Sequence, residues 1–227
     1  MAGIPTMSDD SFTAGSAVKP RVLFVANPNN PTGTLLSHAD LQKIVRASIE
    51  TAIVIDEAYA EFSGLTVLPW IQKYPHLFVT RTFSKAAGLA GLRLGAVLAA
   101  KSSLAMLRRA MPPYPVNVAA LAAAEAAIRD VRALRNYVQD IKRVREWFEK
   151  ELLHLGAAIY PSSANFLLAD FGPRGPALFK QLAARGILVR ERKDFRPGFA
   201  RITIGTEPEM RRFVKETKSI WRASIQA

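Results

Sequence analysis

The sequence has no cysteine and only three histidines among its 227 residues. Without cysteine, the chain can form neither disulfide bonds nor thiolate metal sites. The histidines, His38, His76 and His154, stand far apart and lack the spacing of metal ligands. We therefore expect no metal centre.

The sequence also lacks long apolar runs. No run reaches the length of a membrane-spanning helix, and residues 1–17 lack the basic start and apolar block of a secretory signal. Hydrophobic residues make up 49% of the chain and charged residues 22%, which is typical of a soluble globular protein. We therefore expect a cytoplasmic protein with no membrane partner.

Acidic residues are scarce in the second half of the chain. Residues 1–100 contain 8 lysines and arginines against 7 acidic residues, whereas residues 101–227 contain 23 against 12. A basic excess can mark a nucleic-acid-binding surface. The basic residues alternate with glutamates at helical spacing, and no zinc-finger or ribonucleoprotein signature is present. We therefore favour the solvated surface of long helices, with no nucleic-acid partner.

The first part of the chain has the pattern of an α/β sheet. A helix is expected at residues 37–50, among short apolar runs that have the length of buried strands. These runs lie at residues 21–26, 52–55, 77–80 and 95–99. Strands that alternate with helices favour a mainly parallel sheet. We expect residues 1–19 to be a tail or loop and residues 20–116 to form a large domain.

The second part of the chain begins with a long helical pattern. Asn117 is expected to cap a helix that Gly156 ends. A helix of about 39 residues is long for a globular protein, so we expect a kink or a helix pair joined near Asp130. Residues 117–156 would then connect the large domain to a smaller one at residues 157–227.

The pattern after residue 156 favours a small α+β domain. Thr206 and Glu209 form a capping box that starts the last helix. The expected strands are residues 157–160, 165–169, 187–190 and 201–204, and the expected helices are residues 176–184 and 207–223.

Polar clusters follow three successive strands of the predicted sheet. Residues 27–33 follow the first strand, residues 56–59 the second and residues 82–95 the third. In α/β sheets, ligands bind beyond the carboxyl ends of the strands. The three clusters therefore predict one composite site.

The third cluster places Lys85 between hydroxyl residues and a glycine-rich run. Small neighbours allow another group to approach the lysine amine, and a lysine in such a pocket can become a nucleophile toward carbonyls. Thr82, Ser84 and Arg93 could hold a phosphate. A Schiff-base lysine and a phosphate grip are what pyridoxal phosphate requires. Taken alone, the segment is also compatible with a glycine-rich turn and an exposed lysine.

The other two clusters contain partners for such a cofactor. Asp56 ends a buried strand and needs a cationic partner, which a protonated pyridine nitrogen would supply. Asn30 and Tyr59 can both donate a hydrogen bond to the hydroxyl oxygen of the cofactor ring. Taken singly, Asn30 is better explained as a turn residue and Tyr59 as a core aromatic, whereas together with Lys85 they favour the cofactor site.

The motifs resemble those of aminotransferases with the aspartate aminotransferase fold (fold type I), and in particular the histidinol-phosphate aminotransferase family. The resemblance covers nearly all of residues 20–225. Three motifs carry it: Asn-Pro-Asn-Asn-Pro-Thr-Gly at residues 27–33, Asp-Glu-Ala-Tyr-Ala-Glu-Phe at residues 56–62, and Thr-Phe-Ser-Lys-Ala-Ala-Gly-Leu-Ala-Gly-Leu-Arg at residues 82–93. Later segments at residues 113–117, 163–166, 186–190 and 201–206 are similar as well.

The resemblance implies a cofactor, substrates and residue roles. Lys85 would bind pyridoxal 5'-phosphate as an internal aldimine and move the proton between the substrate and the cofactor. Arg201, helped by Arg190, would bind the anionic group of the small-molecule amino donor and of the 2-oxo acid, because the arginine fork suits both carboxylate and phosphate. The remaining cofactor contacts would come from Asn30, Asp56, Tyr59, Thr82, Ser84 and Arg93.

The resemblance leaves alternatives open. A threonine-phosphate decarboxylase or another class I/II aminotransferase would share the scaffold, and a basic binding module could keep the scaffold without the chemistry. Arg190 and Arg201 could instead be a surface pair in a basic cluster.

The resemblance also implies a longer, homodimeric family member with a further N-terminal third. That portion would complete the phosphate site and supply the aromatic ring that stacks on the cofactor. The four strands would then be the middle of a larger sheet with both edges unpaired, and bare edges favour aggregation. We expect the 227-residue chain alone to be a poor aminotransferase and to self-associate.

Overall fold

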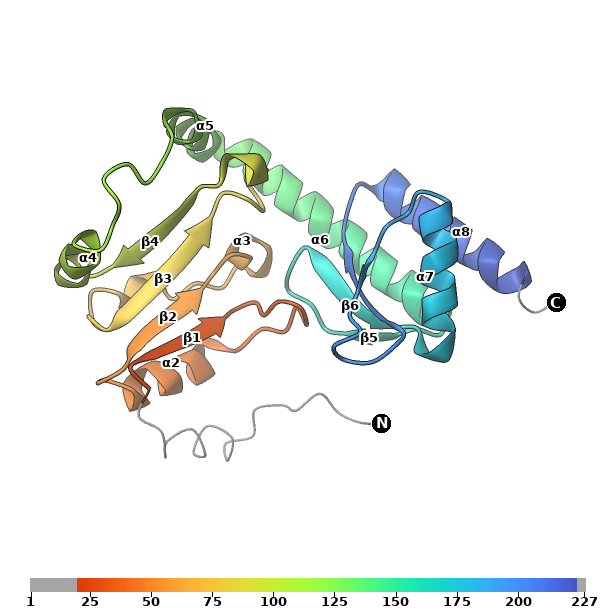
Figure 1. Ribbon diagram of the computed structural model, residues 1–227, viewed down its shortest axis with the longest axis horizontal. Coiled ribbons are helices and arrows are strands. Elements are labelled where there is room, and N and C mark those ends of the chain that lie inside the picture. Colours follow the sequence, from red (N-terminus) through yellow and green to blue (C-terminus); the bar gives the residue numbers. More distant parts are fainter. Residues whose placement is uncertain (1–19, 224–227) are drawn as a thin grey trace.

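The computed structural model describes residues 20–223, which form two four-stranded sheets and the helices around them (Figure 1). The tail predicted for residues 1–19 lies outside the described residues. The strands of the first sheet occur in chain order, as β1 (Val22–Ala26), β2 (Ala52–Asp56), β3 (Leu77–Thr82) and β4 (Gly95–Ala99).

The first sheet is mainly parallel, as predicted. β1, β2 and β3 run parallel, and β4 pairs antiparallel with β3. In the register, Ala26 stands opposite Asp56, and Asp56 stands opposite Thr80. The three parallel strands therefore end at one edge of the sheet, directly before the polar clusters. In residues 20–223, β1 and β4 are the outer strands of this sheet.

One face of the first sheet is covered by α2 (His38–Ala47). The Ser37 hydroxyl accepts a hydrogen bond from the Asp40 N–H and caps the helix. Three residues of the helix, Leu41, Ile44 and Val45, pack against the inward-facing residues of the strands. These strand residues are Ile53, Ile55, Leu77 and Val79.

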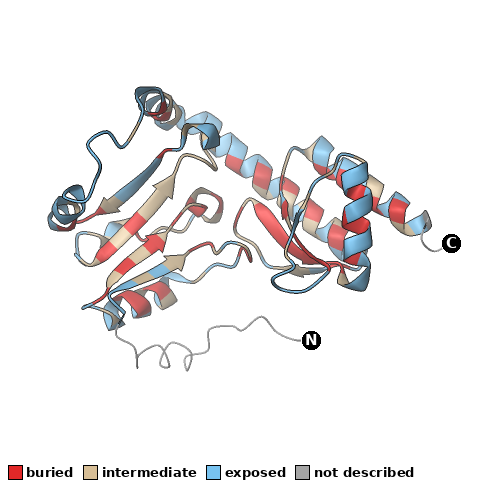
Figure 2. Ribbon diagram, in the orientation of Figure 1, coloured by how far each residue is buried: buried red, intermediate tan, exposed pale blue. Residues whose placement is uncertain are grey.

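The other face of the first sheet leaves apolar side chains in solvent. Phe24 of β1 is 73% exposed, and Val97 of β4 is also exposed. The outer side of α5 (Val118–Arg129) is apolar and exposed too (Figure 2). These side chains form apolar patches on the surface of the sheet domain.

Two helices lead from the first sheet to the second. Asn117 caps α5 by accepting a hydrogen bond from Ala120, and Asp130 caps α6 (Val131–His154) by accepting one from Ala133. The sequence left open a kink or a helix pair near Asp130, and the structure has two helices that meet there. α6 continues to the second sheet (Figure 1), where its buried positions gather (Figure 2).

The second sheet is antiparallel, with the strand order β5-β6-β8-β7. The Thr206 N–H donates to the Glu209 carboxylate at the start of α8, as a capping box requires, and hydrogen bonds from Thr206 lower the pKa of Glu209. The elements of this part are β5 (Ala158–Tyr160), β6 (Phe166–Asp170), α7 (Gly175–Ala184), β7 (Arg190–Glu191), β8 (Phe199–Thr203) and α8 (Glu207–Ala223).

Two details differ from the prediction. The strand expected at residues 187–190 is only the two-residue β7, because the Ile187 N–H is bonded to the Leu182 carbonyl at the end of α7. α4 (Lys101–Arg108) was not predicted, since Ser103 is its only buried residue and it has no apolar stripe. Short helices also occur at Ala60–Ser63 (α3), Leu68–Trp70, Ala90–Leu92 and Gly172–Arg174.

The largest core lies between the second sheet and the helices α6, α7 and α8. Phe148, Phe166 and Phe213 are buried in it, and Tyr59 and Phe62 from the end of the first sheet belong to the same cluster. Apolar packing therefore continues from the first sheet to the second and fixes the two relative to each other.

Two further kinds of feature are absent from residues 20–223. No helix in this range is both long and apolar enough to cross a membrane. No group of His, Asp or Glu side chains in it is suited to hold a metal ion.

Phe148 provides a test of the core. Its side chain is fully buried and packs edge-to-face on Phe213, with the two ring centres 5.2 Å apart. We expect Phe148→Ala to lower the free energy of unfolding by about 3–5 kcal/mol, since it removes buried area and leaves a cavity. Tyr114→Ala, at a position 93% exposed, is the control. Equal urea midpoints for the two variants in circular dichroism would contradict this packing.

Candidate active site

The predicted polar clusters meet at the carboxyl edge of the first sheet. β1 and β2 point toward the second sheet in Figure 1. The Asn27 N–H donates to the Asp56 carbonyl, and the Glu57 N–H donates to the Thr80 carbonyl. The residues that directly follow β1 and β2 thus continue the hydrogen bonding of the sheet. This arrangement brings residues 27–33, 56–59 and 80–85 to one edge.

Asp56 is held by its neighbour on β3. One oxygen of its carboxylate accepts hydrogen bonds from the Thr80 hydroxyl at 2.9 Å and from the Ala58 N–H at 3.2 Å. The other oxygen has no hydrogen-bond partner within residues 20–223. The half-buried carboxylate is therefore fixed in orientation with one oxygen left for a ligand.

Thr80 is a residue that sequence reasoning missed. Its hydroxyl orients Asp56, although it stands in an otherwise apolar run that includes Leu77 and Val79. A polar residue next to the end of a buried strand was the available signal. The pairing itself follows only from the strand register.

Lys85 lies in the loop between β3 and β4. Backbone hydrogen bonds close this loop, from Phe83 to Leu94, from Leu89 to Phe83 and from Gly88 to Lys85. Gly88 has a φ of +71°, which glycine adopts without strain. The amine of Lys85 lies 5.4 Å from the centre of the Tyr59 ring. It makes no ion pair with any of the described side chains.

Tyr59 connects the lysine to the second sheet. It is buried, and its ring meets Phe166 edge-to-face at 5.2 Å. On the far side of Phe166, the guanidinium of Arg201 lies 5.2 Å from the centre of that ring. A continuous line of contacts thus leads from Lys85 to Arg201.

Asn30 joins the same line from the first cluster. Its side-chain oxygen accepts a hydrogen bond of 2.5 Å from Arg201, which is 171 residues away in sequence. Since the oxygen is occupied, the NH2 group of Asn30 remains as a donor. This is the role that the sequence predicted for it, and the structure leaves it available.

Three residues were predicted to hold a phosphate, and the loop brings two of them together. The Thr82 hydroxyl accepts a hydrogen bond from the Ser84 N–H at 3.1 Å. Arg93 is exposed and donates to the Ala90 carbonyl within its own loop. Its φ of +55° is in the left-handed region, which costs a residue with a side chain roughly 1–2 kcal/mol. Such strain often marks a functional position.

Arg190 and Arg201 stand directly opposite each other on β7 and β8. Like charges at facing positions of a strand pair repel each other. The Nε of Arg201 is buried and has no hydrogen-bond partner among residues 20–223, whereas Arg190 is exposed. Both residues line a cavity of 530 Å³ next to Met210 and Phe213. An anion between the two guanidinium groups would relieve the repulsion and satisfy the free N–H.

Gly33 keeps the first cluster against the second sheet. Its carbonyl accepts a hydrogen bond from the Ser163 N–H. It has a φ of +80°, and a Cβ at this position would lie 2.2 Å from the Ser162 hydroxyl oxygen. Only glycine allows this close approach, which brings Asn30 within reach of Arg201.

A family model matches most of this chain. The model for aminotransferase class I and II matches residues 9–216. The chain therefore belongs to the aminotransferase class I and II family, whose members depend on pyridoxal phosphate. Its fold is that of fold type I aminotransferases, as the sequence predicted.

Individual relatives are similar over most of this chain. Histidinol-phosphate aminotransferase 1 of Carboxydothermus hydrogenoformans is 36% identical over 212 residues, which cover 93% of this chain and 60% of that protein. Histidinol-phosphate aminotransferase of Sinorhizobium meliloti, solved in complex with pyridoxal-5'-phosphate, has a TM-score of 0.82 at 26% identity and covers 92% of this chain and 60% of its own.

A decarboxylase shares the same fold. L-threonine-O-3-phosphate decarboxylase of Porphyromonas gingivalis has a TM-score of 0.78 at 25% identity and covers 88% of this chain and 64% of its own. The chain spans about 60% of the length of the curated relatives that it matches.

Gly33→Ala tests whether this contact assembles the site. We expect the added methyl group to separate Asn30 from Arg201, because it would overlap Ser162. Gly64→Ala is a matched control, since Gly64 also has a positive φ but a methyl group added there would meet no atom within 4 Å. Hydrogen exchange at residues 29–34 and 162–164 should rise in Gly33→Ala and stay unchanged in Gly64→Ala. Equal protection in both variants would show that the contact is not needed.

Proposed function

We propose that this chain carries the active-site residues of a pyridoxal-phosphate-dependent aminotransferase. The proposed reaction transfers the amino group of histidinol phosphate to 2-oxoglutarate and gives imidazole acetol phosphate and glutamate, a step of histidine biosynthesis. The observation that carries the proposal is the Arg201–Asn30 hydrogen bond. It joins a candidate anion-binding residue to a candidate cofactor-binding residue at the strand edge that holds Asp56 and Lys85.

The donors and acceptors at this edge fit pyridoxal phosphate. Asp56 offers an open carboxylate oxygen to a protonated pyridine nitrogen, and Asn30 offers an N–H to the ring hydroxyl oxygen. The phenol of Tyr59 makes no hydrogen bond within residues 20–223 and can serve the same oxygen. Thr82 and Ser84 supply hydroxyl groups for the phosphate, and Arg93 supplies a guanidinium.

The residues have separable tasks. When bound, pyridoxal phosphate supplies an electron sink for bond cleavage at the α-carbon of the substrate. Lys85 would hold the cofactor through its amine, and the same amine would be the base that takes the proton from the substrate α-carbon. Asp56 keeps the proton on the ring nitrogen. At about 3 Å and an effective dielectric near 20, such an ion pair contributes roughly 5 kcal/mol before desolvation.

Arg201 and Arg190 have the task of binding the substrate anion. The arginine fork binds carboxylate and phosphate equally well. One arginine pair can therefore accept the α-carboxylate of glutamate in one half-reaction and the phosphate of histidinol phosphate in the other. The repulsion between the two facing side chains favours an anion of either kind.

A decarboxylase acting on threonine phosphate is the second candidate. The structural likeness to the Porphyromonas gingivalis enzyme favours it, since the substrate would again present a phosphate to the arginine pair. The test is to incubate the cofactor-loaded chain with each phosphate ester, with and without 2-oxoglutarate. Glutamate formed from histidinol phosphate supports the aminotransferase, and carbon dioxide released from threonine phosphate supports the decarboxylase. If the chain shows neither activity and binds no cofactor, a basic binding module is the remaining alternative.

We also propose a homodimer in a cytoplasmic enzyme. Exposed apolar side chains on α4, on α5 and in the segment between them form a surface that suits a protein partner. These side chains are Met106, Met111, Tyr114, Val118, Leu121 and Ile128.

Lys85 is expected to react with the cofactor. Borohydride reduction in the presence of pyridoxal phosphate, followed by peptide mapping, should label Lys85, and no label should remain in Lys85→Arg. Lys73→Arg is the matched control, because Lys73 also lies over a tyrosine ring, that of Tyr74, at 5.6 Å. Its label should equal that of the unaltered chain. A label at another lysine alone would refute this role.

Arg201→Ala is expected to weaken binding of glutamate and histidinol phosphate alike. Loss of a charged hydrogen-bond partner costs about 1.5–3 kcal/mol, or roughly ten- to hundred-fold in Kd. Isothermal titration calorimetry of the cofactor-loaded chain measures this change in Kd. Arg196→Ala is the control, since Arg196 also lies over a phenylalanine ring but bonds to Asp170 instead of Asn30. If Arg201→Ala binds both substrates as well as the unaltered chain, Arg190 and Arg201 are a surface pair in a basic cluster.

A further inference from the structure

A second pair of polar side chains lies behind the proposed cofactor site. Asp56 and Thr80 bond on one face of the first sheet. The next residues along the two strands are Glu57 and Arg81, whose side chains point to the opposite face because side chains alternate along a strand. They form an ion pair of 2.6 Å. Each face of the β2–β3 end is thus held by its own side-chain pair.

The carboxylate of Glu57 is buried and fully hydrogen-bonded. It is 1% exposed. One oxygen accepts a hydrogen bond from the Val67 N–H at 2.6 Å. The other accepts from the Thr66 hydroxyl and from the Nε of Arg81, both at 2.8 Å. A buried charge with this number of donors is fixed in one position.

All three nitrogens of the Arg81 guanidinium are used. Besides its two contacts with Glu57, Arg81 donates to Glu61 at 2.8 Å and to the Thr66 hydroxyl at 3.0 Å. Glu61 belongs to α3, two residues after Tyr59. The network therefore ties together the end of β2, the end of β3, and α3. These are the segments that carry Asp56, Lys85 and Tyr59.

The Lys85 loop is held by its strand ends and by α5, on which Phe83, Leu92 and Leu94 pack. Its own hydrogen bonds close it between Phe83 and Leu94. A cavity of 190 Å³ lies against it, lined by Arg81 and Glu61 on one side and by loop residues such as Phe83 and Ala86 on the other. The side chains of the ion-pair network therefore lie against the loop that carries Lys85.

We propose that Glu57 and Arg81, together with Glu61, are positioning residues of the cofactor site. They hold the ends of β2 and β3 so that Asp56 and Lys85 reach the same bound ring. The inference rests on the proposed function. A buried ion pair is a poor source of stability compared with apolar packing, so its value at this place is the fixed geometry that it gives to the Lys85 loop.

Arg81→Lys tests the proposal, because lysine keeps the charge but cannot hold three partners in a plane. A misplacement of about 1 Å can cost roughly 10²-fold in reaction rate. We expect the rate of borohydride labelling of Lys85 by pyridoxal phosphate to fall ten-fold or more, and the visible absorbance of the cofactor-loaded chain to shift. The thermal midpoint without cofactor should stay close to that of the unaltered chain.

Two further variants keep the test decisive. Glu61→Gln removes only the charge of the partner of the Arg81 Nη1 and leaves Glu57 paired, so it should give a smaller loss of labelling rate in a folded chain. Arg185→Lys is the matched control, since Arg185 forms a half-buried pair with Glu216 between α7 and α8. It should leave labelling unchanged.

The outcomes separate this proposal from the proposed function. If Lys85 of the unaltered chain takes no label, the cofactor assignment fails first and the positioning proposal fails with it. The unaltered chain can also take the label. If Arg81→Lys and Glu61→Gln then react as fast as the unaltered chain and give the same spectrum, only the positioning proposal is overturned. If labelling falls equally in Arg185→Lys, the effect is one of general stability and the proposal is also overturned.

Discussion

One hydrogen bond, from the guanidinium of Arg201 to the amide of Asn30, joins the two sheets at the candidate site. It fixes Arg201 above the ring of Phe166 and leaves the amide N–H of Asn30 as a donor. The same side chain keeps a buried Nε without a partner within residues 20–223. A buried donor without an acceptor is costly, and this supports the anion-binding role that we propose for Arg201.

Most of the first sheet and its polar edge could be predicted from the sequence. Buried parallel strands are continuous apolar runs, and Asn, Gly and Pro mark their ends, so both signals are local. The Asp56–Thr80 bond and the Tyr59–Phe166–Arg201 contacts could not be predicted, because they depend on strand register and on packing between distant segments. The two-residue β7 was misjudged for a related reason, since a contact with α7 decides where residue 187 lies.

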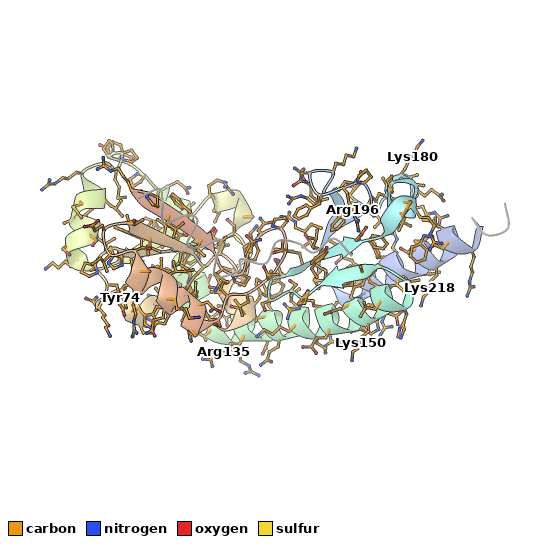
Figure 3. All side chains as sticks on the ribbon, turned by 90° about the horizontal axis from the view of Figure 1, so that it is seen from below. Tyr74, Arg135, Lys150, Lys180, Arg196 and Lys218 are labelled. Carbon is orange, nitrogen blue, oxygen red and sulfur yellow. The ribbon has the colours of Figure 1, made fainter. Side chains whose placement is uncertain are left out.

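The basic half of the chain is better explained by its helices than by a polyanion surface. Several of its cations pair with acidic residues of neighbouring elements, as Arg185 does with Glu216 and Lys218 with Glu151. Lys150, Lys180 and Lys218 lie on three different helices and extend in different directions (Figure 3). A nucleic-acid site needs its cations on one continuous face, whereas these are spread around the molecule. Two places are local exceptions. One is the pair of facing arginines of β7 and β8, and the other is a groove along α8 that Arg211, Lys215, Lys218 and Arg222 line.

The end of β2 and β3 shows which property the fold maintains here. Asp56–Thr80 occupies one face and Glu57–Arg81 the other, although apolar residues would pack there at lower cost. Polar pairs have defined directions, and apolar packing of similar volume permits small shifts. A lysine on a glycine-rich loop beside a cavity needs a fixed strand end more than it needs added stability. The need for a fixed geometry therefore accounts for the polar residues at this edge, on the face of Asp56 and Thr80 as well as on the face of Glu57 and Arg81.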